Sequence, residues 1–499
     1  MHSPGTERMS THRDINEVLP RELLCKIFKL SLDPQYLKRD RCRLSLVCRL
    51  WYQWVEDSAL LWTNITAPVG LSYLNKSFKN SKEALLELKH WAQSRSAPFV
   101  SVERFMQEAS AHAARWRSLS VAPDSPPNWE EVLRPLTTQS APKLEVLKIN
   151  GRGMSDWNTG RISITIGDGT FPNLDDVFLA CVPASVHASS STALRSFDID
   201  QIHHISLHEL VGILENSPHL ETLRVRLCWR VKMTGKTWSV DSIKLERLVH
   251  IKLLDLDASV IDTILSIIRA PNCDKLIISC AIPDPPSHMV LFNSSTGHLF
   301  QRFREKDQKR PLLDVRVGAD EEGDEYLSVD VGYIHINVRV NTNGVAQLQN
   351  ILRWIGGNSD PEGSYPVSLE CDFLDAGYVE AFGPPFHVKR IKIYDYTQHS
   401  ALEHLSRSRL LGSSAWPCPQ LEHLEYDIVS DLDSRNRTYL LDMLKARYGR
   451  ENIADGSGKP LPTPLKSITL RSEIRPDELI RDIKEILRDL EINWKSPEW

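Results

Sequence analysis

One six-residue pattern recurs along most of this 499-residue chain and constrains its fold more than any other feature. It reads apolar, two variable residues, apolar, one variable residue, apolar. Because alternation with a period of two is typical of a half-buried strand, each copy predicts a short β-strand. The copies begin at Trp116, Leu144, Leu174, Leu194, Leu220, Leu248 and Cys273, and then, at looser spacing, at Leu312, Val388, Leu421 and Leu465.

Helical patterns lie between several of these copies. Leu207, Leu210, Val211 and Leu214 recur at helical spacing, and residues 260–268 show the same periodicity. Strand, helix and strand at a period of 20–30 residues are typical of a solenoid whose parallel strands line one face. The asparagine of strict leucine-rich repeats is mostly absent. The prediction is therefore an α/β fold with an irregular leucine-rich-repeat-like solenoid of parallel strands.

Three parts of the chain depart from this pattern. The charged turn at 320–324 and the alternating residues that follow it predict a hairpin rather than a repeat. Residues 82–94 and 102–115 predict helices that link the N-terminal segment to the first copy. From Pro476 on, apolar residues at helical spacing predict an amphipathic helix that caps the last repeat.

In the N-terminal segment the apolar residues are spaced differently, in two helical patterns followed by the short apolar stretch Leu60–Trp62. The first pattern begins at Pro20, which suits the first turn of a helix, and Asp33-Pro34 ends it. A helical unit of about fifty residues has too little interior to bury so many apolar side chains, so part of this surface should contact the rest of the chain or another protein. The main apolar residues are Leu23, Leu24, Ile27, Phe28, Leu44, Val47, Trp51 and Val55.

The order and spacing of this segment resemble the F-box family, whose motif is a small helical unit that docks on the Skp-type adaptor of cullin–RING ubiquitin ligases. The resemblance rests on Leu19-Pro20, Glu22–Leu24, Ile27-Phe28, Leu32–Pro34, Leu44–Arg49, Trp51 and Leu61-Trp62. It implies that the adaptor is contacted by residues among Leu19, Pro20, Leu23, Leu24, Ile27, Phe28, Val47 and Trp51. Which of them face the adaptor and which fill the unit's own core stays open.

The chain as a whole is similar to F-box proteins with C-terminal leucine-rich-repeat arrays, particularly the expanded F-box families of fungi. On this basis residues 14–66 are the F-box, 67–115 a helical linker, 116–475 the irregular solenoid and 476–499 a capping helix. The resemblance implies a substrate-recognition subunit of an SCF-type ubiquitin ligase, bound through the adaptor to a cullin. Two alternatives stay open: an F-box protein with no degradative role, and a repeat scaffold whose N-terminal helices only cap the array.

Composition and motifs argue against other classes of function. The formal net charge of −5 gives no support for binding nucleic acid or an anionic membrane. No apolar run approaches the length of a transmembrane helix and the N-terminus is polar, so the cytosol or nucleus is expected. In the cluster of His203, His204 and His208, the last two are four residues apart and could share a helix face, but no third ligand stands at a diagnostic spacing. Asp455–Lys459 lacks the spacing of a phosphate loop. We therefore expect no catalytic residue, metal or cofactor.

The repeat pattern also predicts which side chains line the open face of the sheet. Alternate residues of a strand point to opposite faces, so the variable positions face away from the core. These positions hold Lys148 and Asn150, Phe178 and Ala180, Asp198 and Asp200, Arg224 and Arg226, Lys252 and Leu254, and Ile277 and Ser279. Arg224, Arg226 and Lys252 are candidates for binding an acidic stretch of a target. The alternative is that these charges merely neutralise acidic residues on neighbouring strands.

Overall fold

The computed structural model describes residues 19–34, 36–67, 70–91, 100–123, 127–151, 162–166, 170–188, 193–202, 205–226, 243–281, 313–319, 325–331, 334–340, 348, 351–352, 365–371, 386–393, 402–403, 405–406, 418–427, 434–449, 462–473 and 475–496. The chain divides into two compact units. The first comprises Met1–Leu220 and Trp229–Lys232, and the second Glu221–Cys228 and Met233–Trp499. Both are mixed α/β structures in which most strands run parallel, as predicted.

The first unit begins with three short helices and a 3-10 turn. The carbonyl oxygen of Pro20 accepts the first hydrogen bonds of the opening helix, from the backbone N–H groups of Leu23 and Leu24. The side chain of Cys48 accepts a hydrogen bond from the Trp51 N–H and so caps the third helix. These elements are α2 (Arg21–Ser31), α3 (Leu37–Ser45), α4 (Arg49–Asp57) and η1 (Ala59–Trp62).

A parallel ladder of six strands follows within the first unit, and each strand pairs with the next in chain order. The strands are β1 (Asn64–Thr66), β2 (Leu86–Trp91), β3 (Trp116–Ala122), β4 (Val146–Asn150), β6 (Asp176–Ala180) and β8 (Ser196–Asp200). A separate parallel pair joins β5 (Ile162–Ile166) to β7 (Ala184–Ala188).

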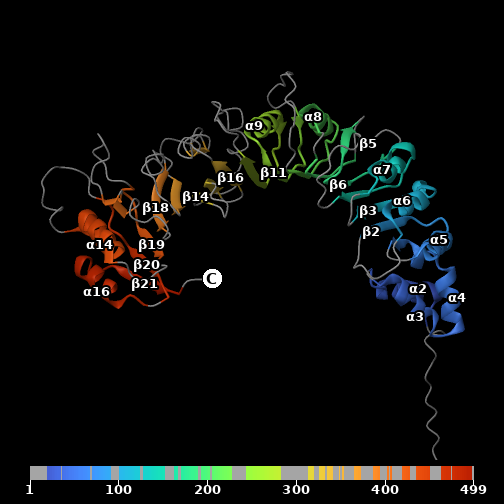
Figure 1. Cartoon of the computed structure of the whole chain (residues 1–499), viewed down its shortest axis with the longest axis horizontal. Helices are drawn as coiled ribbons and strands as arrows, with labels where there is room; N and C mark the ends of the chain where they lie inside the picture. The colour runs from blue at the N-terminus through green and yellow to red at the C-terminus, as the bar shows by residue number, and fades with distance from the viewer. Residues whose placement is uncertain are drawn as a thin grey trace, which may run out of the picture. The chain divides into compact units, whose positions relative to one another are not determined.

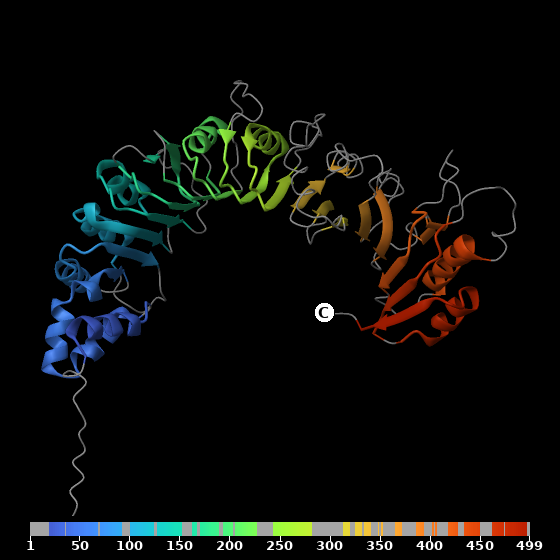
Figure 2. The same ribbon diagram turned by 180° about the vertical axis from the view of Figure 1, so that it is seen from behind.

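Helices connect several of these strands, as parallel pairing requires. Helices α5, α6 and α7 lie on the same side of the ladder in both views (Figure 1 and Figure 2). The side chain of Ser206 and that of Glu209 form a capping box at the start of α8. The connecting elements are α5 (Leu71–Asn80), α6 (Val102–Ser110), η2 (Ala113–Arg115), α7 (Trp129–Thr138) and α8 (Leu207–Glu215).

The linker before the first predicted repeat is not wholly helical. Residues 102–110 form helix α6 as expected, but the predicted helix at 82–94 is wrong, because this segment contains strand β2. Leu86, Leu88 and His90 are buried while the residues between them are only partly covered. This alternation, together with pairing to both β1 and β3, fits a strand and not a helix.

The second unit contains a longer ladder, with pairings β9-β11-β13-β16-β15-β14-β17-β18-β19-β20-β21. A short parallel pair, β10 (Ile243–Lys244) and β12 (Ile268–Arg269), lies apart from it. Among the described residues of the second unit, the longer helices are α9 (Ala258–Ile267), α14 (Ser434–Tyr448) and α16 (Asp477–Ile486). The ladder strands are β9 (Thr222–Arg226), β11 (His250–Asp257), β13 (Lys275–Ala281), β14 (Leu313–Ala319), β15 (Glu325–Val331), β16 (Ile334–Val340), β17 (Tyr365–Cys371), β18 (Phe386–Ile393), β19 (His423–Asp427), β20 (Ser467–Arg471) and β21 (Glu491–Lys495).

An antiparallel meander interrupts this second ladder. Strands β15 and β16 form the predicted hairpin, and β15 also pairs antiparallel with β14. Because β16 is the strand that pairs with β13, two strands, β16 and β15, separate β13 from strand β14, which the copy that begins at Leu312 forms. The predicted solenoid of parallel strands is therefore interrupted here by antiparallel pairs, although β14 pairs in parallel with β17 on its other side.

The C-terminal segment also differs from the prediction of a capping helix over 476–499. Helix α16 covers Asp477–Ile486, but β21 follows it and pairs in parallel with β20. The indole N–H of Trp494 donates to the carbonyl oxygen of Ser472 at 3.2 Å and ties this last strand down. In the described residues the ladder thus ends in a strand rather than beneath a helix.

All the six-residue copies contribute residues to strands, and the apolar positions of the copies whose burial is described are buried. In β8, for example, Phe197 and Ile199 are fully buried while Asp198 and Asp200 are partly exposed. Ala180 is an exception, because it was expected on the open face but is buried. Within the described part of the chain, no helix has the length and hydropathy needed to cross a bilayer.

Candidate functional site

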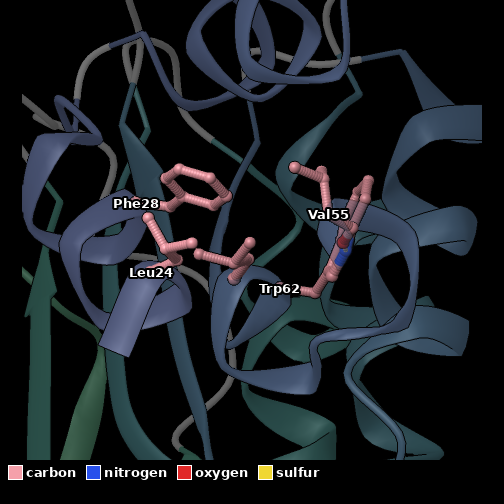
Figure 3. Packing of buried hydrophobic residues seen from close by; sticks show 5 residues of the cluster. Leu24, Phe28, Val55 and Trp62 are labelled. Carbon is pink, nitrogen blue, oxygen red and sulfur yellow. Dashed lines mark hydrogen bonds between the residues drawn. The ribbon is translucent and has the colours of Figure 1, made fainter. Parts of the chain in front are cut away.

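The N-terminal helices close over a small apolar core. Leu24 and Phe28 from α2 point toward Val55 of α4 and Trp62 of η1 (Figure 3), and Leu61 of η1 belongs to the same cluster. Each of these five side chains is at most 2% exposed. Full burial of such side chains is the main source of stability for a unit this small.

Helix α2 also carries apolar side chains on the side that faces away from this core. Leu23 is 47% exposed, Ile27 48% and Leu30 87%. Their spacing of four and three residues places them in one row along the helix, which we call the outer stripe. A helix that packs only on its own chain carries polar residues on this side, so the outer stripe is the feature of the unit that its own core does not explain.

A second exposed apolar site lies between α3 and α4. Leu46 is 83% exposed and Val47 is 59% exposed, and both precede the Cys48 cap of α4. Leu30 and Leu46 were not among the predicted adaptor contacts, although Leu46 lies in the Leu44–Arg49 stretch that carries the F-box resemblance. The spacing of Leu30, seven residues after Leu23, is the signal that could have identified it.

The structure separates the predicted adaptor contacts into two groups. Pro20, Leu23, Ile27 and Val47 are exposed and available to a partner. Leu24 and Phe28 are buried, while Leu19 and Trp51 pack partly buried against the core cluster. The ring centroids of Phe28 and Trp51 are 4.4 Å apart. These buried and half-buried side chains support the exposed ones from behind.

A buried cation, Arg41, joins the N-terminal helices to the first strand and to α5. It is 3% exposed. Its Nε donates to the carbonyl oxygen of Leu61 at 2.7 Å, and its Nη2 donates to the carbonyl oxygen of Asn64 at 2.8 Å. Its Nη1 lies 3.3 Å from the hydroxyl of Tyr73, whose pKa is raised by burial. No sequence pattern identified this residue, because arginine at an ordinary helical position predicts exposure.

The N-terminal helices are basic within an acidic chain. Residues 19–54 contain eight Lys or Arg and only three Asp or Glu. Lys26 and Lys29 are exposed on α2 beside the outer stripe. A partner that covers the stripe would therefore meet positive charge at its edge.

The predicted target-binding residues lie on neighbouring strands of the second unit. Arg224 and Lys252 are direct register partners on β9 and β11. Arg226 forms an ion pair with Asp255, at 3.4 Å between Nε and Oδ2, so part of its charge is neutralised. Asp198 and Asp200 belong to β8 of the first unit, and their predicted position beside Arg224 and Arg226 stays a prediction.

The structure describes only part of the other motifs found in the sequence. His208 is exposed on α8, whereas His203, His204 and Asp455–Lys459 lie outside the described residues. Among the residues that the structure describes, no cluster of histidine, cysteine and carboxylate side chains could hold a metal ion.

Comparison with known protein families gives one match. Residues 17–67, about a tenth of the chain, match the F-box-like family. No curated protein matches the chain. The matched range contains α2, α3, α4, η1 and β1, and with them the outer stripe and the buried core. The chain therefore carries an F-box-like domain at residues 17–67.

Proposed function

We propose that this protein is the substrate-recognition subunit of an SCF-type ubiquitin ligase. The F-box-like domain binds a Skp-type adaptor, which links the chain to a cullin, and the strand–helix array binds a protein target. The observation that carries the proposal is the outer stripe of Leu23, Ile27 and Leu30 on a helix whose other side already fills the domain core. Such a subunit works in the cytosol or the nucleus.

The proposed mechanism is proximity rather than chemistry by this chain. Holding a target beside the ubiquitin-carrying enzyme raises the effective concentration of the target's lysines. The array supports this role because an irregular leucine-rich-repeat-like sheet presents a long row of partly exposed side chains, such as those of β9 and β11. Arg224, Arg226 and Lys252 are the proposed contacts for an acidic stretch of the target.

The test compares variants of the full chain in binding a recombinant Skp-type adaptor. Leu30→Glu and Ile27→Glu should weaken binding by at least tenfold, because each puts a carboxylate into an apolar interface. Leu85→Glu is the matched control, since Leu85 is 41% exposed and lies outside the F-box-like match. A wild-type chain that is folded and has no affinity for the adaptor contradicts the proposal.

The alternatives are separated by a second measurement. Proteins captured by both the wild type and Leu30→Glu are candidate targets, and those lost with Leu30→Glu are ligase components. A captured target whose half-life lengthens under proteasome inhibition supports the degradative role. If its half-life is unchanged, the chain is an F-box protein without that role.

A further inference from the structure

Two tryptophans in the first unit occupy corresponding positions, Trp62 at the end of turn η1 and Trp116 directly after turn η2, at the start of β3. The indole Nε1 of Trp62 donates to the carbonyl oxygen of Val55 at 2.7 Å, and that of Trp116 donates to the carbonyl oxygen of Ala109 at 3.1 Å. Both bonds reach back seven residues to the end of a helix. The two tryptophans are 54 positions apart and both are at most 1% exposed.

The elements around these tryptophans correspond as well. Helix α4, turn η1 and strand β1 follow each other as do helix α6, turn η2 and strand β3. The two helices, α4 and α6, each have nine residues. Three residues after each tryptophan lies a buried aliphatic side chain of the strand, Ile65 in β1 and Leu119 in β3. The end of the F-box-like domain is thus built like the helix–turn–strand unit that leads into the first predicted repeat.

Contacts between this segment and the next elements are those of neighbouring repeats. The rings of Trp62 and Tyr73 lie 5.6 Å apart. Glu56 of α4 accepts hydrogen bonds from Lys76 at 2.7 Å and Asn80 at 3.2 Å, both on α5, and the first of these raises the pKa of Lys76. Strand β1 pairs in parallel with β2 over its whole length. Packed faces and a continued ladder are what couple adjacent repeats in a solenoid.

Arg41 completes this arrangement at the first strand. A strand at the edge of a ladder presents unpaired backbone groups, which natural proteins cover. The guanidinium of Arg41, held in α3, covers the carbonyl oxygens of Leu61 and Asn64 at this position. Helix α3, which follows the helix that carries the outer stripe, therefore closes the N-terminal end of the ladder.

We propose that α4–η1–β1 is the first repeat of the array as well as the last part of the F-box-like domain, so that residues 19–122 open and close as one cooperative unit. A partner bound to the outer stripe then stabilises strands β1 to β3, which it does not touch. This second statement rests on the proposed function, whereas the first does not.

Native-state hydrogen exchange on the full-length wild type tests the shared repeat without any variant. As urea is raised, amides of α4 and of β2 should merge into one unfolding isotherm, because residues of one cooperative unit open together. Separate isotherms for α4 and β2 that persist up to global unfolding overturn the proposal.

A tryptophan variant gives an independent measurement. Trp62→Phe removes the indole N–H but keeps an aromatic ring, and loss of one buried hydrogen bond should speed exchange about fivefold in α2, β1 and β2 alike. The control is Trp494→Phe, which removes an indole hydrogen bond in the second unit and should leave residues 19–122 unchanged. Acceleration confined to residues 19–62 overturns the shared repeat.

A third experiment measures hydrogen exchange of the full-length wild type in the presence of a saturating concentration of a Skp-type adaptor. Slower exchange in β1 and β2 as well as in α2 supports the coupling. If the adaptor binds and protects only α2 to α4, the coupling is wrong while the proposed function stands. If the adaptor does not bind, the proposed function fails, and the two adaptor-free experiments still decide the shared repeat.

Discussion

Arg41 donates a hydrogen bond from Nη2 to the carbonyl oxygen of Asn64 at 2.8 Å, across 23 residues of sequence. This bond links a helix of the F-box-like domain to the first strand of the ladder. Arg41→Lys should lower the stability of this region by about 1–3 kcal/mol, because a lysine cannot reach both carbonyl oxygens and one stays buried without a donor.

Urea titrations followed by hydrogen exchange of residues 19–122 would measure this loss. Arg43→Lys is the matched control, since Arg43 lies on the same helix and is exposed. Equal stability of Arg41→Lys and Arg43→Lys would show that the Arg41 hydrogen bonds contribute nothing.

The two sides of α2 should respond differently to truncation. Phe28→Ala should cost about 3–5 kcal/mol of stability, because it empties a fully buried site. Ile27→Ala should change stability by less than about 0.5 kcal/mol and still weaken adaptor binding. Thermal unfolding and adaptor titration of both variants check this, and a large stability loss from Ile27→Ala would place it in the core instead.

Mild acid should weaken the region around η2. Burial, and after it the charge of Arg115, lower the pKa of His112 from its usual 6.5. Its ring stacks on Phe78 at 4.6 Å, and its Nδ1 lies 3.2 Å from Nη2 of Arg115. As the pH falls, the imidazole of His112 therefore binds a proton in the unfolded chain before it does so in the folded chain. The stability of the folded chain is fully present above pH 6.5 and should decline as the pH falls below this value.

The variant His112→Gln keeps a polar side chain that does not titrate. Its stability should therefore fall less than that of the wild type between pH 7.5 and pH 5.5, as measured by urea denaturation. Parallel pH profiles for the two proteins would assign the acid sensitivity to other groups.

Removal of the last strand should promote association. Deleting residues 491–499 uncovers the edge of β20, which presents free backbone groups for pairing with another chain. Sedimentation velocity should then show oligomers, whereas the full chain sediments as a smaller species. If only the longer deletion of 476–499 causes association, helix α16 is the protecting element, as the sequence predicted.

Charge reversal on the second ladder tests the proposed target face. The double variant Arg224→Glu and Lys252→Glu should abolish target capture, leave adaptor binding intact and barely shift the melting temperature. Arginine is common at such binding sites because its planar guanidinium group can donate two parallel hydrogen bonds to one carboxylate. A large fall in melting temperature with unchanged capture would instead favour a purely cross-strand role for these charges.

Local patterns were enough to predict the strands and the presence of the F-box-like unit. Each six-residue copy alternates, and alternation depends only on how neighbouring side chains point, so all copies form strands. The same reasoning found the hairpin of β15 and β16. The same reasoning gave a wrong prediction at β2, which was expected to be helical. Only three buried positions alternate in this strand, and so short a segment also fits a helical pattern.

What the tertiary structure alone decided is which elements meet. A strand pattern carries no information about its partner, so the insertion of β16 and β15 between β13 and β14 could not be read from the copy at Leu312. Periodicity placed Leu23, Leu24, Ile27 and Phe28 in one stripe, and only the packing of α2 on Val55 and Trp62 divided it into a buried and an exposed side. The role of Arg41 depends on carbonyl oxygens 20 and 23 residues away, which come together because the chain folds back over its first strand.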